Sequence, residues 1–347
     1  EILPLESIKV MKFEDFWYVV AESRNLKPGQ VLARQILGQW LAIFRDHHGM
    51  AIALEDRCVH RHSRLSCGSV KQGNLHCPYH GWIYDHGGQV IGVPAEDQEF
   101  KPRENLRTKC YPTMEREGFI YVCLGEPIQL PFALPQYGKK GWQRIRLIHR
   151  FTNNVTNCVE NFIDIPHTAS VHPGIFRTAQ RQAIKMTVGR HQGQVKAEYH
   201  NENNNLGWWG KFLNSQGNEI SHTDRFIMPN ITSVEYKFSS QRHLFITSQS
   251  VPETEQFTLV YTDVAFNYGM WNVFAIPLVW WTAKRIIAQD LKILAIQQEV
   301  ISKYGSDFNH TPADTIHIFV ESIRTAIAKG EDPRKLPDKT VEVTFYV

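Results

Sequence analysis

Short runs of alternating apolar and polar residues dominate two stretches of the chain. The first covers residues 13–56 and contains "FWYVVAES" and "WLAIFRDHHGMAIALED", which predicts a hairpin that turns at "DHHG". A further strand is predicted at "GFIYVCLG". The second stretch runs from about 183 to 266 and is interrupted by the turn-forming segments "RHQGQ", "NENNNLG", "NSQGN" and "VPETEQ". Both stretches are therefore predicted to form β-sheets.

After the second stretch the pattern of apolar residues becomes helical. It predicts a long helix over about 278–304 that ends at Gly305. A second helix is predicted to begin at Thr311-Pro312 and to end at Gly330, since proline is favoured in the first turn and glycine just past the end. The tail "TVEVTFYV" alternates again and is typical of an edge strand.

The segment "EPIQLPFALPQYGKKG" at 126–141 carries three prolines and two glycines and is interpreted as a linker. It separates a small all-β domain, placed at 13–130, from an α+β domain at 140–347. Residues 1–12 are interpreted as an N-terminal arm. The length of 347 residues is sufficient for two such domains and a substantial core.

Composition narrows the classes of function. Apolar residues make up 42% and charged residues 21% of the chain, a normal globular balance. A net charge of +3 without a basic stripe argues against nucleic acid as a partner. Six cysteines are too few for a disulfide scaffold of this length, and their proximity to histidines indicates metal ligation in a reducing compartment. Because the sequence shows no charged-then-apolar leader, a cytoplasmic location is predicted.

One apolar stretch raises the question of a membrane. Residues 264–283, "VAFNYGMWNVFAIPLVWWTA", carry no charge and reach the nominal length of a membrane span. The residues that interrupt it are Asn267, Gly269, Asn272 and Pro277. We therefore interpret the stretch as an apolar pocket wall, or as a surface that makes peripheral contact with a membrane, rather than as a span.

Two mixed pairs of cysteine and histidine, Cys58-x-His60 and Cys77-x-x-His80, are separated by sixteen residues. A zinc finger groups its cysteines together and its histidines together. Mixed pairs instead suit a [2Fe–2S] cluster in which both thiolates bind one iron and both imidazoles bind the other. A structural zinc ion stays the alternative.

The two Cys–His pairs together resemble the motif of a Rieske domain. In "CPYHGW", Pro78 and Gly81 form a tight loop whose backbone N–H groups can approach bridging sulfides. Respiratory Rieske subunits carry an extra cysteine two residues after the second cluster cysteine, and this chain has Tyr79 there. A stand-alone Rieske electron carrier would end near residue 125, so it would leave most of the chain unexplained.

The remaining cysteines and the nearby histidines are not assigned as ligands. Those interpreted as ordinary loop residues are His62, Cys67, His76 and His86. Those predicted to be small buried hydrophobes are Cys110, Cys123 and Cys158.

A second motif, D-x-x-H-x-x-x-x-H, is formed by Asp164, His167 and His172. Two neutral imidazoles and one carboxylate suit Fe(II) and leave positions open for dioxygen. On a straight helix, residues five apart point about 140° away from each other. The helix is therefore predicted to end or bulge between the two histidines, which Pro166 favours. Both motifs together resemble the Rieske non-haem iron oxygenases over nearly the whole chain.

The third iron ligand is assigned to Asp290. The apolar residues around it on the predicted helix are Ile286, Ile287, Ile293 and Leu294. A carboxylate in such surroundings is costly unless it is paired or bound to a metal. In the family the corresponding aspartate commonly follows an acidic residue, whereas Gln289 precedes it here. Glu299, more than two turns along, is the weaker candidate.

The resemblance implies a fold, an assembly and further roles. The second domain is expected to be a helix-grip-like antiparallel sheet whose helices hold the mononuclear iron. Family members resemble one another in being head-to-tail homotrimers, in which the cluster of one subunit serves the iron of its neighbour. Asp164 would then connect His167 to His80 of the partner subunit and orient both. Asn161, assigned with Asp164 to the catalytic site, either lines the iron pocket or faces the core.

The electrons for this chemistry are expected to come from a separate protein. No G-x-G-x-x-G follows a predicted strand, and no plant-type cysteine run occurs. A separate NAD(P)H-dependent reductase, a ferredoxin or both are therefore implied. The resemblance then implies that the chain is a terminal oxygenase, which uses O2 for mono- or dihydroxylation or for oxidative demethylation.

The substrate is predicted from apolar and aromatic segments. "GMWNVFAIPLVWW" and a lid at 203–217 favour a bulky, hydrophobic, weakly polar molecule that is sterol-like or polycyclic. Bacterial sterol C-4 demethylating oxygenases are one similar group. A smaller aromatic substrate of a ring dioxygenase or an N- or O-demethylase is the alternative, and the same residues could also form only core or subunit interface.

Overall fold

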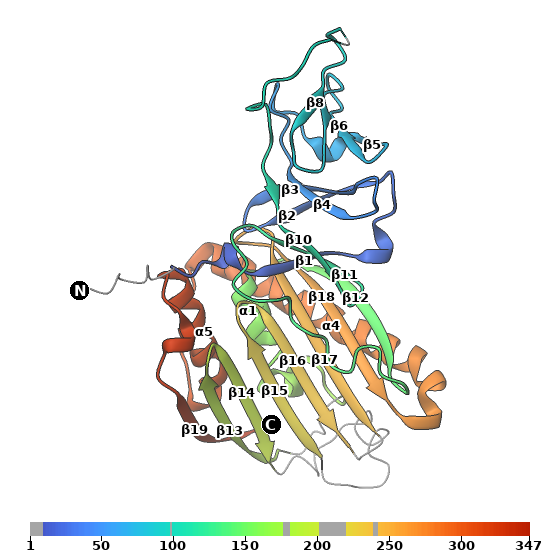
Figure 1. The fold of residues 1–347 in the computed structure, drawn as a ribbon. Coiled ribbons are helices and arrows are strands. Elements are labelled where there is room, and N and C mark those ends of the chain that lie inside the picture. Colours follow the sequence, from blue (N-terminus) through green and yellow to red (C-terminus); the bar gives the residue numbers. More distant parts are fainter. Residues whose placement is uncertain (1–9, 98, 176–180, 201–219, 239–241) are drawn as a thin grey trace, which may run out of the picture. The chain divides into compact units, whose positions relative to one another are not determined.

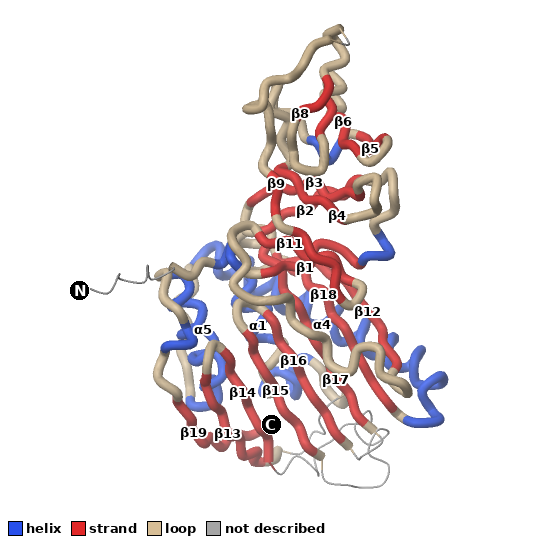
Figure 2. Tube along the Cα trace, in the orientation of Figure 1, coloured by secondary structure: helices blue, strands red, loops and turns tan. Residues whose placement is uncertain are grey.

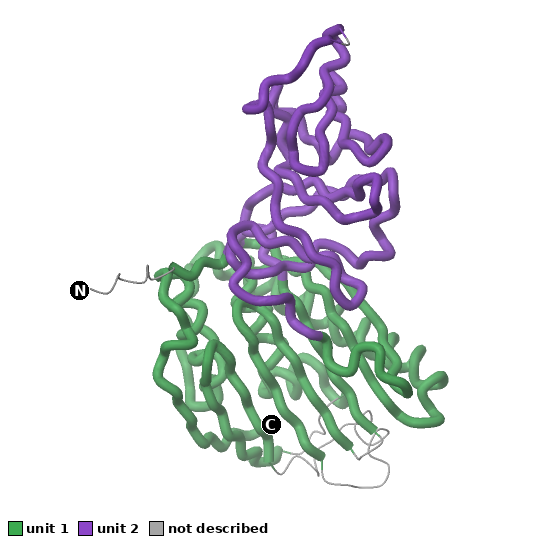
Figure 3. Tube along the Cα trace, in the orientation of Figure 1, with its two compact units in different colours: residues 1–13, 134–250, 256–347 green, residues 14–133, 251–255 purple. Residues whose placement is uncertain are grey.

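The computed structural model describes residues 10–97, 99–175, 181–200, 220–238 and 242–347 (Figure 1). The chain divides into two compact units, one made of 14–133 with 251–255 and the other of the remaining residues (Figure 3). The change of unit at 133–134 falls inside the segment that the sequence marks as a linker. The domain limits of 13–130 and 140–347 stay a proposal.

The unit of residues 14–133 consists of short strands, turns and loops (Figure 2). Its strands are β1 (Trp17–Glu22), β2 (Val31–Ile36), β3 (Gln39–Arg45), β4 (Ala51–Glu55), β5 (Ser69–Lys71), β6 (Asn74–His76), β7 (Ile83–Tyr84), β8 (Val90–Gly92), β9 (Cys110–Tyr111), β10 (Thr113–Arg116) and β11 (Phe119–Cys123). Its 3-10 turns are η1 (Phe13–Asp15), η2 (Ser23–Asn25) and η3 (Leu65–Cys67). Three sheets result, in the strand orders β1-β11-β10, β2-β3-β4-β9 and β5-β6-β7-β8.

The predicted hairpin at "DHHG" is confirmed as the β3–β4 pair. The carboxylate of Asp46 closes the turn, because its Oδ1 accepts hydrogen bonds from the backbone N–H groups of His48 and Met50 at 2.9 Å. The hairpin contributes to a buried cluster that reaches the loops of the Cys–His motif. The buried members of this cluster are Ala42, Phe44, Leu54, Cys58, Leu65, Leu75, Cys77, Tyr84 and Val90.

The other unit is built on one eight-stranded sheet in the order β12-β18-β17-β16-β15-β14-β13-β19. Its strands are β12 (Gln143–Phe151), β13 (Ala183–His191), β14 (Gln194–His200), β15 (Ser221–Ile227), β16 (Ile231–Lys237), β17 (His243–Pro252), β18 (Thr258–Asn267) and β19 (Lys339–Tyr346). Its helices and 3-10 turns are α1 (Val155–Asn161), α2 (Pro166–Val171), η4 (Gly269–Trp271), α4 (Asn272–Tyr304), η5 (Pro312–Asp314), α5 (Thr315–Ala328) and η6 (Pro333–Lys335). The neighbouring strands pair antiparallel, so the predicted α+β class is confirmed.

The long helices pack on one face of this sheet (Figure 1). α4 packs against β12, and α5 packs against β13 and β14. Leu147 and Val260, from β12 and β18, share a buried cluster with Ile287 and Leu294 of α4. Because Asp290 lies between these two α4 residues at helical spacing, this packing turns its side chain toward the sheet.

The predicted start of the long helix at 278 is wrong, because α4 already begins at Asn272. The Asn272 side chain fixes this start: its Oδ1 accepts a hydrogen bond from the Tyr268 N–H, and its Nδ2 donates to the Gly141 carbonyl. Burial of Ala275 and Val279 in the core stabilises the added turns. The helix therefore continues through Pro277.

The remaining elements follow the sequence pattern. Thr311 and Asp314 form a capping box ahead of α5, close to the predicted start. β19 is an edge strand, as predicted, and the structure pairs it with β13. The lid at 203–217 and the turns "NENNNLG" and "NSQGN" lie outside the described residues. Among the described residues, no helix has the length and apolar character of a membrane span.

Candidate metal centres

Of the two histidines of the second motif, His167 lies on the short helix α2 and His172 lies just past its end. α1 is capped by Asn154, whose side chain accepts from the Asn157 N–H, and it ends at Asn161. Pro166 then opens α2, which ends at Val171. The backbone at His172 has left the helical conformation, with φ −116° and ψ 52°. The predicted interruption between His167 and His172 is therefore confirmed.

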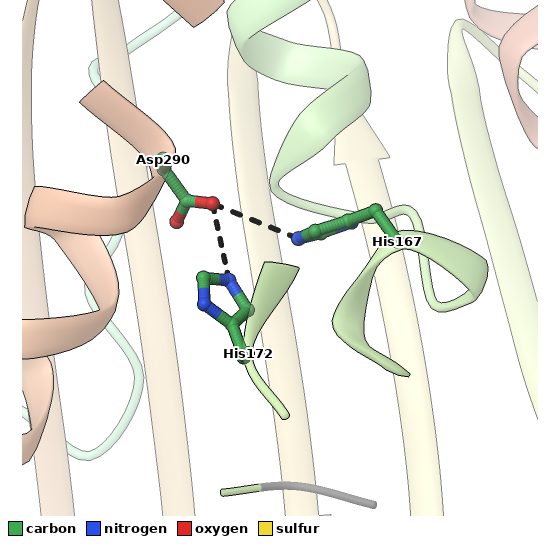
Figure 4. Close-up of side chains that lie close together, drawn as sticks. All are labelled: His167, His172 and Asp290. Carbon is green, nitrogen blue, oxygen red and sulfur yellow. Dashed lines mark ion pairs between the residues drawn. The ribbon is translucent and has the colours of Figure 1, made fainter. Parts of the chain in front are cut away.

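Three side chains converge in this unit (Figure 4). One ligating atom from each of His167, His172 and Asp290 lies within 4.8 Å of the other two. The Oδ1 of Asp290 is 3.1 Å from His172 Nε2 and 3.7 Å from His167 Nε2. His172 is 1% and Asp290 5% exposed. No other group of three such residues in the described part of the chain offers comparable convergence.

This arrangement fits a bound cation. Asp290 Oδ1 is buried and has no hydrogen-bond partner among the residues that the structure describes, which is costly for a carboxylate oxygen. A metal ion held by the three side chains would satisfy it. Two imidazoles and one carboxylate are typical of non-haem Fe(II) sites with open positions. The weaker candidate Glu299 is exposed and is not part of the group.

The Nδ1 atom of each histidine lies close to the oxygen of a polar side chain. The amide Oε1 of Gln289 lies 2.9 Å from His172 Nδ1. Since an amide oxygen can only accept, Nδ1 carries the proton, and Nε2 is left as a lone pair directed toward Asp290. Asp164 Oδ2 lies 3.3 Å from His167 Nδ1. Burial alone would lower the pKa of His167. The contacts with Asp164 outweigh this effect, so the pKa of His167 lies above its ordinary value.

The role of Gln289 could not be read from the sequence. There it was only a departure from the acidic residue that commonly stands at this position. It lies next to Asp290 on α4, and only the fold brings it opposite His172.

A cavity lies beside the three converging side chains. Asn161 and Asp164 line it, so of the two alternatives for Asn161 the structure supports the pocket. The opposite wall is formed by the sheet and includes His222 and Asp224, which the sequence analysis did not identify. Their separation of one residue on a strand is a weak signal, because it becomes meaningful only once the cavity is known.

The four residues of the first motif lie on two loops of the other unit. Cys58 and Cys77 are buried, whereas His60 and His80 are exposed with ring centroids 4.6 Å apart. These four side chains do not converge on one point as His167, His172 and Asp290 do. A pair of buried thiolates and a separate pair of exposed imidazoles are typical of a two-iron cluster and not of a single tetrahedral zinc ion.

Backbone turns hold the two loops. The N–H of Cys58 donates to the Ser63 carbonyl, and the N–H of Cys77 donates to the Trp82 carbonyl. Gly81 has φ +69°, and a Cβ there would lie 3.1 Å from Pro94, so glycine is required at this tight turn. Burial raises the pKa of the Cys77 thiol. A bound cation would offset that cost by stabilising the thiolate.

Tyr84 is a further residue that the sequence analysis missed. Its hydroxyl donates a hydrogen bond of 3.1 Å to Cys58 Sγ and accepts one of 3.0 Å from the Val59 N–H. Hydrogen bonds to cluster sulfurs influence the reduction potential. Tyr84 is therefore placed to stabilise the negative charge on the Cys58 thiolate.

The other cysteines follow the prediction with one exception. Cys123 and Cys158 are buried, as predicted. The prediction for Cys110 is wrong, because it is exposed. It lies in the two-residue strand β9 next to the buried Tyr111, and the alternation of a strand turns the two side chains to opposite faces. His76 lies in strand β6 rather than in a loop.

Two families of known domains match the chain in sequence. Residues 16–112 match the Rieske [2Fe-2S] domain, and residues 152–321 match the vanillate O-demethylase oxygenase C-terminal domain. The first match contains the Cys58–His80 motif. The second contains His167, His172 and Asp290.

Curated relatives are similar over part of the chain. The 4beta-methylsterol monooxygenase of Methylococcus capsulatus is 36% identical over 44% of this chain and 43% of its own length. The oxygenase component of dicamba O-demethylase from Stenotrophomonas maltophilia is 32% identical over 52% of this chain and 54% of its own. The matched region thus spans about half of these relatives. The crystal structure of dicamba monooxygenase bound to dicamba shares the fold, with a TM-score of 0.76 at 21% identity over 92% of this chain and 99% of that chain.

Proposed function

Since this chain belongs to the Rieske oxygenases, with a Rieske [2Fe–2S] domain followed by an oxygenase C-terminal domain, we propose that it is the terminal oxygenase component of a multicomponent system. It uses O2 and electrons derived from NAD(P)H to hydroxylate its substrate or to demethylate it oxidatively. The observation that carries the proposal is the buried convergence of His167, His172 and Asp290 in a chain that also holds the Cys–His motif. An electron carrier would not need this second site.

The proposed ligands follow from the two sites. Cys58 and Cys77 hold one iron of the cluster, and His60 and His80 hold the other. His167, His172 and Asp290 hold the mononuclear iron. When bound, the two groups supply one-electron transfer and the activation of dioxygen, respectively. Glu299 is not among the proposed ligands.

The chain's own polar residues then orient these ligands. Gln289 fixes the tautomer of His172, and Asp164, whose Oδ2 lies 3.3 Å from His167 Nδ1, orients the His167 ring. Asn161 is half-buried and lines the same cavity, and its buried Nδ2 makes no hydrogen bond within the described residues. We assign this amide to the positioning of substrate or of dioxygen.

The electrons are proposed to come from a separate NAD(P)H-dependent reductase, a ferredoxin or both. The chain is proposed to assemble as a homotrimer, in which Asp164 connects His167 to His80 of the partner subunit. Exposure of His80 supports this role, because its imidazole is accessible to another protein. The cytoplasmic location stays a prediction.

The proposed substrate is bulky and mainly hydrophobic, sterol-like or polycyclic. The apolar residues of the cavity support this choice, and they include Phe151, Phe162, Ile163, Ile246, Ile286 and Ile287. The similarity to a 4beta-methylsterol monooxygenase points in the same direction. A smaller aromatic substrate of a dioxygenase or an N- or O-demethylase is the second candidate, which the similarity to dicamba O-demethylase supports.

The test of the cluster assignment is spectroscopic. We expect the purified protein to be brown and its reduced form to give a Rieske-type EPR signal. His60→Cys or His80→Cys should change that signal and lower the reduction potential by roughly a few hundred millivolts, because a neutral ligand is replaced by an anionic one. A colourless protein with stoichiometric zinc would contradict the proposal.

A peripheral contact with lipid is also proposed, at the start of α4. The exposed apolar side chains there are Met270, Trp271, Val273, Phe274, Trp280 and Trp281. Lys284 and Arg285 lie over the rings of Trp280 and Trp281. Tryptophan beside basic residues is typical of a helix that lies in the interface of an anionic membrane.

Flotation with phosphatidylcholine vesicles that contain phosphatidylglycerol tests this contact. The wild-type protein is expected to float with the vesicles, and the double variant Trp271→Ser, Phe274→Ser is expected to lose most of this binding. Trp40→Ser is the control, since Trp40 is an exposed tryptophan of the other unit. Equal flotation of all three proteins would contradict the contact.

A further inference from the structure

The cavity beside His167, His172 and Asp290 has a wall that is formed by one face of the eight-stranded sheet. Its residues alternate along the strands, as a single face requires. They are His222 and Asp224 of β15, Thr232, Val234 and Tyr236 of β16, Ile246 and Ser248 of β17, and Thr262 of β18. The strand register places Val234 and Ile246 opposite each other in the middle of this face. It places His222 opposite Tyr236 at one corner.

This corner is built around a carboxylate. His222 Nε2 lies 3.0 Å from Asp224 Oδ1, and the Tyr199 hydroxyl donates a hydrogen bond of 2.9 Å to Asp224 Oδ2. The imidazole is stacked between two tyrosine rings, with centroid distances of 4.5 Å to Tyr199 and 4.0 Å to Tyr236. His222 is 2% and Asp224 3% exposed. The geometry of the pair is therefore fixed before any substrate binds.

A pair of this kind needs a reason beyond stability. Taking a carboxylate and an imidazole out of water costs free energy, and apolar residues of similar volume would stabilise a core at least as well. The pair lies on the cavity wall rather than inside the sheet's packing. Each Asp224 oxygen accepts one of the two hydrogen bonds and has a second lone pair. The carboxylate can thus accept a further hydrogen bond from the cavity.

The charge of the cavity limits what can donate that hydrogen bond. Among the described residues that line it, there is no lysine or arginine, while Asp164, Asp224 and Asp290 are carboxylates. An anionic substrate group beside Asp224 would be repelled in a low-dielectric site. An alcohol carries a hydrogen-bond donor without a charge, and the apolar middle of the wall suits the rest of such a molecule.

We propose that the His222–Asp224 pair binds the polar end of the substrate, and that this end is an uncharged hydroxyl group on an otherwise apolar molecule. The inference rests on the proposed function, because it takes this cavity as the substrate site. It names two specificity-determining residues and a substrate class, neutral alcohols as opposed to sulfonates, sulfates and carboxylates.

Binding to the metal-loaded wild-type protein tests the substrate class without turnover. Equilibrium dialysis would use three pairs of probes: cholesterol and cholesterol sulfate, 2-naphthylmethanol and 2-naphthoate, and benzyl alcohol and benzoate. In the best-binding pair we expect the alcohol to bind roughly ten- to hundredfold more tightly than the anion, since hydrogen bonds to charged groups have about that effect. An anion that binds as tightly as its alcohol, or failure of all three alcohols to bind, overturns the proposal.

Asp224→Asn tests the residues. The amide keeps the size of the side chain but removes the charge, so the preference for alcohol over anion should disappear in protein that still holds both metals. The control is Glu235→Gln. Glu235 Oε1 lies 2.8 Å from His243 Nε2, and this second His–carboxylate pair lies on the opposite face of the same sheet, away from the cavity. The control should keep the full preference, and equal changes in both variants would overturn the proposal.

Measurements on the same samples distinguish a failure of the proposed function from a failure of the proposed role of His222 and Asp224. Iron content and the EPR signal report on the proposed function. Protein without cluster or mononuclear iron would sink the oxygenase assignment. Protein that holds both metals but shows no preference for the alcohols would overturn only the role of His222 and Asp224.

Discussion

His167→Ala, His172→Ala and Asp290→Ala are each expected to abolish turnover and mononuclear iron binding while the brown colour of the cluster stays. The three side chains converge within 4.8 Å, so each provides a third of the proposed protein ligation. Loss of one ligand leaves a two-ligand site, which cannot hold Fe(II) against the solvent. The proposed cluster ligands lie on loops of the other unit, so the cluster should be unaffected. Iron analysis and EPR of the reduced proteins, together with O2 uptake, provide the measurement.

Glu299→Ala is the matched control for Asp290→Ala. Both residues are carboxylates of α4, but Glu299 is exposed and Asp290 is buried at the site. The control should retain iron and activity. If Asp290→Ala keeps its iron and Glu299→Ala loses it, the wrong carboxylate was assigned.

Gln289→Leu adds a graded variant to the same series. It removes the acceptor of the His172 Nδ1 proton without touching a proposed ligand. Loss of such an outer partner typically weakens metal affinity by about 10- to 100-fold. Titration of the iron-depleted protein with Fe(II) should therefore give weaker binding with unchanged stoichiometry. Unchanged affinity would mean that the hydrogen bond to His172 contributes nothing to the orientation of the ring.

The parts of the site that were predictable from the sequence are local in the chain. Cys58 and His60, or Cys77 and His80, are close enough in sequence for one loop to bring each pair together. Pro166 favours a new helix start, so the boundary just ahead of His167 follows from short-range sterics. The placement of Asp290 on the buried face of α4 follows from its spacing to apolar neighbours.

The parts that were missed depend on contacts between distant segments. Gln289 faces His172 only because α4 packs against the sheet beside α2. The pairing of His222 with Asp224 is local, but its place in the cavity depends on the register of β15 with β16. Tyr84 reaches Cys58 across 26 residues. No periodicity or spacing in a single sequence encodes such partners.

The start of α4 shows how tertiary packing extends a helix beyond its sequence signal. Pro277 argues for a boundary because it removes one backbone hydrogen bond and its ring disfavours the preceding turn. The first turn is nevertheless retained, with Ala275 and Val279 buried in the core and Asn272 tied to the Gly141 carbonyl. These contacts offset the cost of the proline.

Asp164→Asn is expected to leave both metal sites filled and to slow electron delivery between them by about a hundredfold. Asp164 Oδ2 lies 3.3 Å from His167 Nδ1, and in the proposed trimer the same carboxylate reaches His80 of the partner subunit. The amide is nearly the same size, but it has no charge and one acceptor oxygen instead of two. A single acceptor cannot serve both imidazoles equally well. Stopped-flow reduction should show a cluster that is still reduced at the normal rate, followed by slow product formation in a single turnover.

Mixed assemblies decide whether this path runs between subunits. Cys77→Ser removes a proposed cluster ligand, and His167→Ala removes a proposed iron ligand, so each variant alone should be inactive. When the two are co-assembled, an intact cluster can face an intact iron across an interface, and part of the activity should return. Adding Asp164→Asn to the cluster variant should remove this recovery, because that subunit supplies the working iron and its bridging carboxylate. The same substitution in the iron variant should not, since its carboxylate faces an iron site that is already inactive. No recovery in the first mixture would mean that each subunit works alone, and both the trimer and the bridging role of Asp164 would then be wrong.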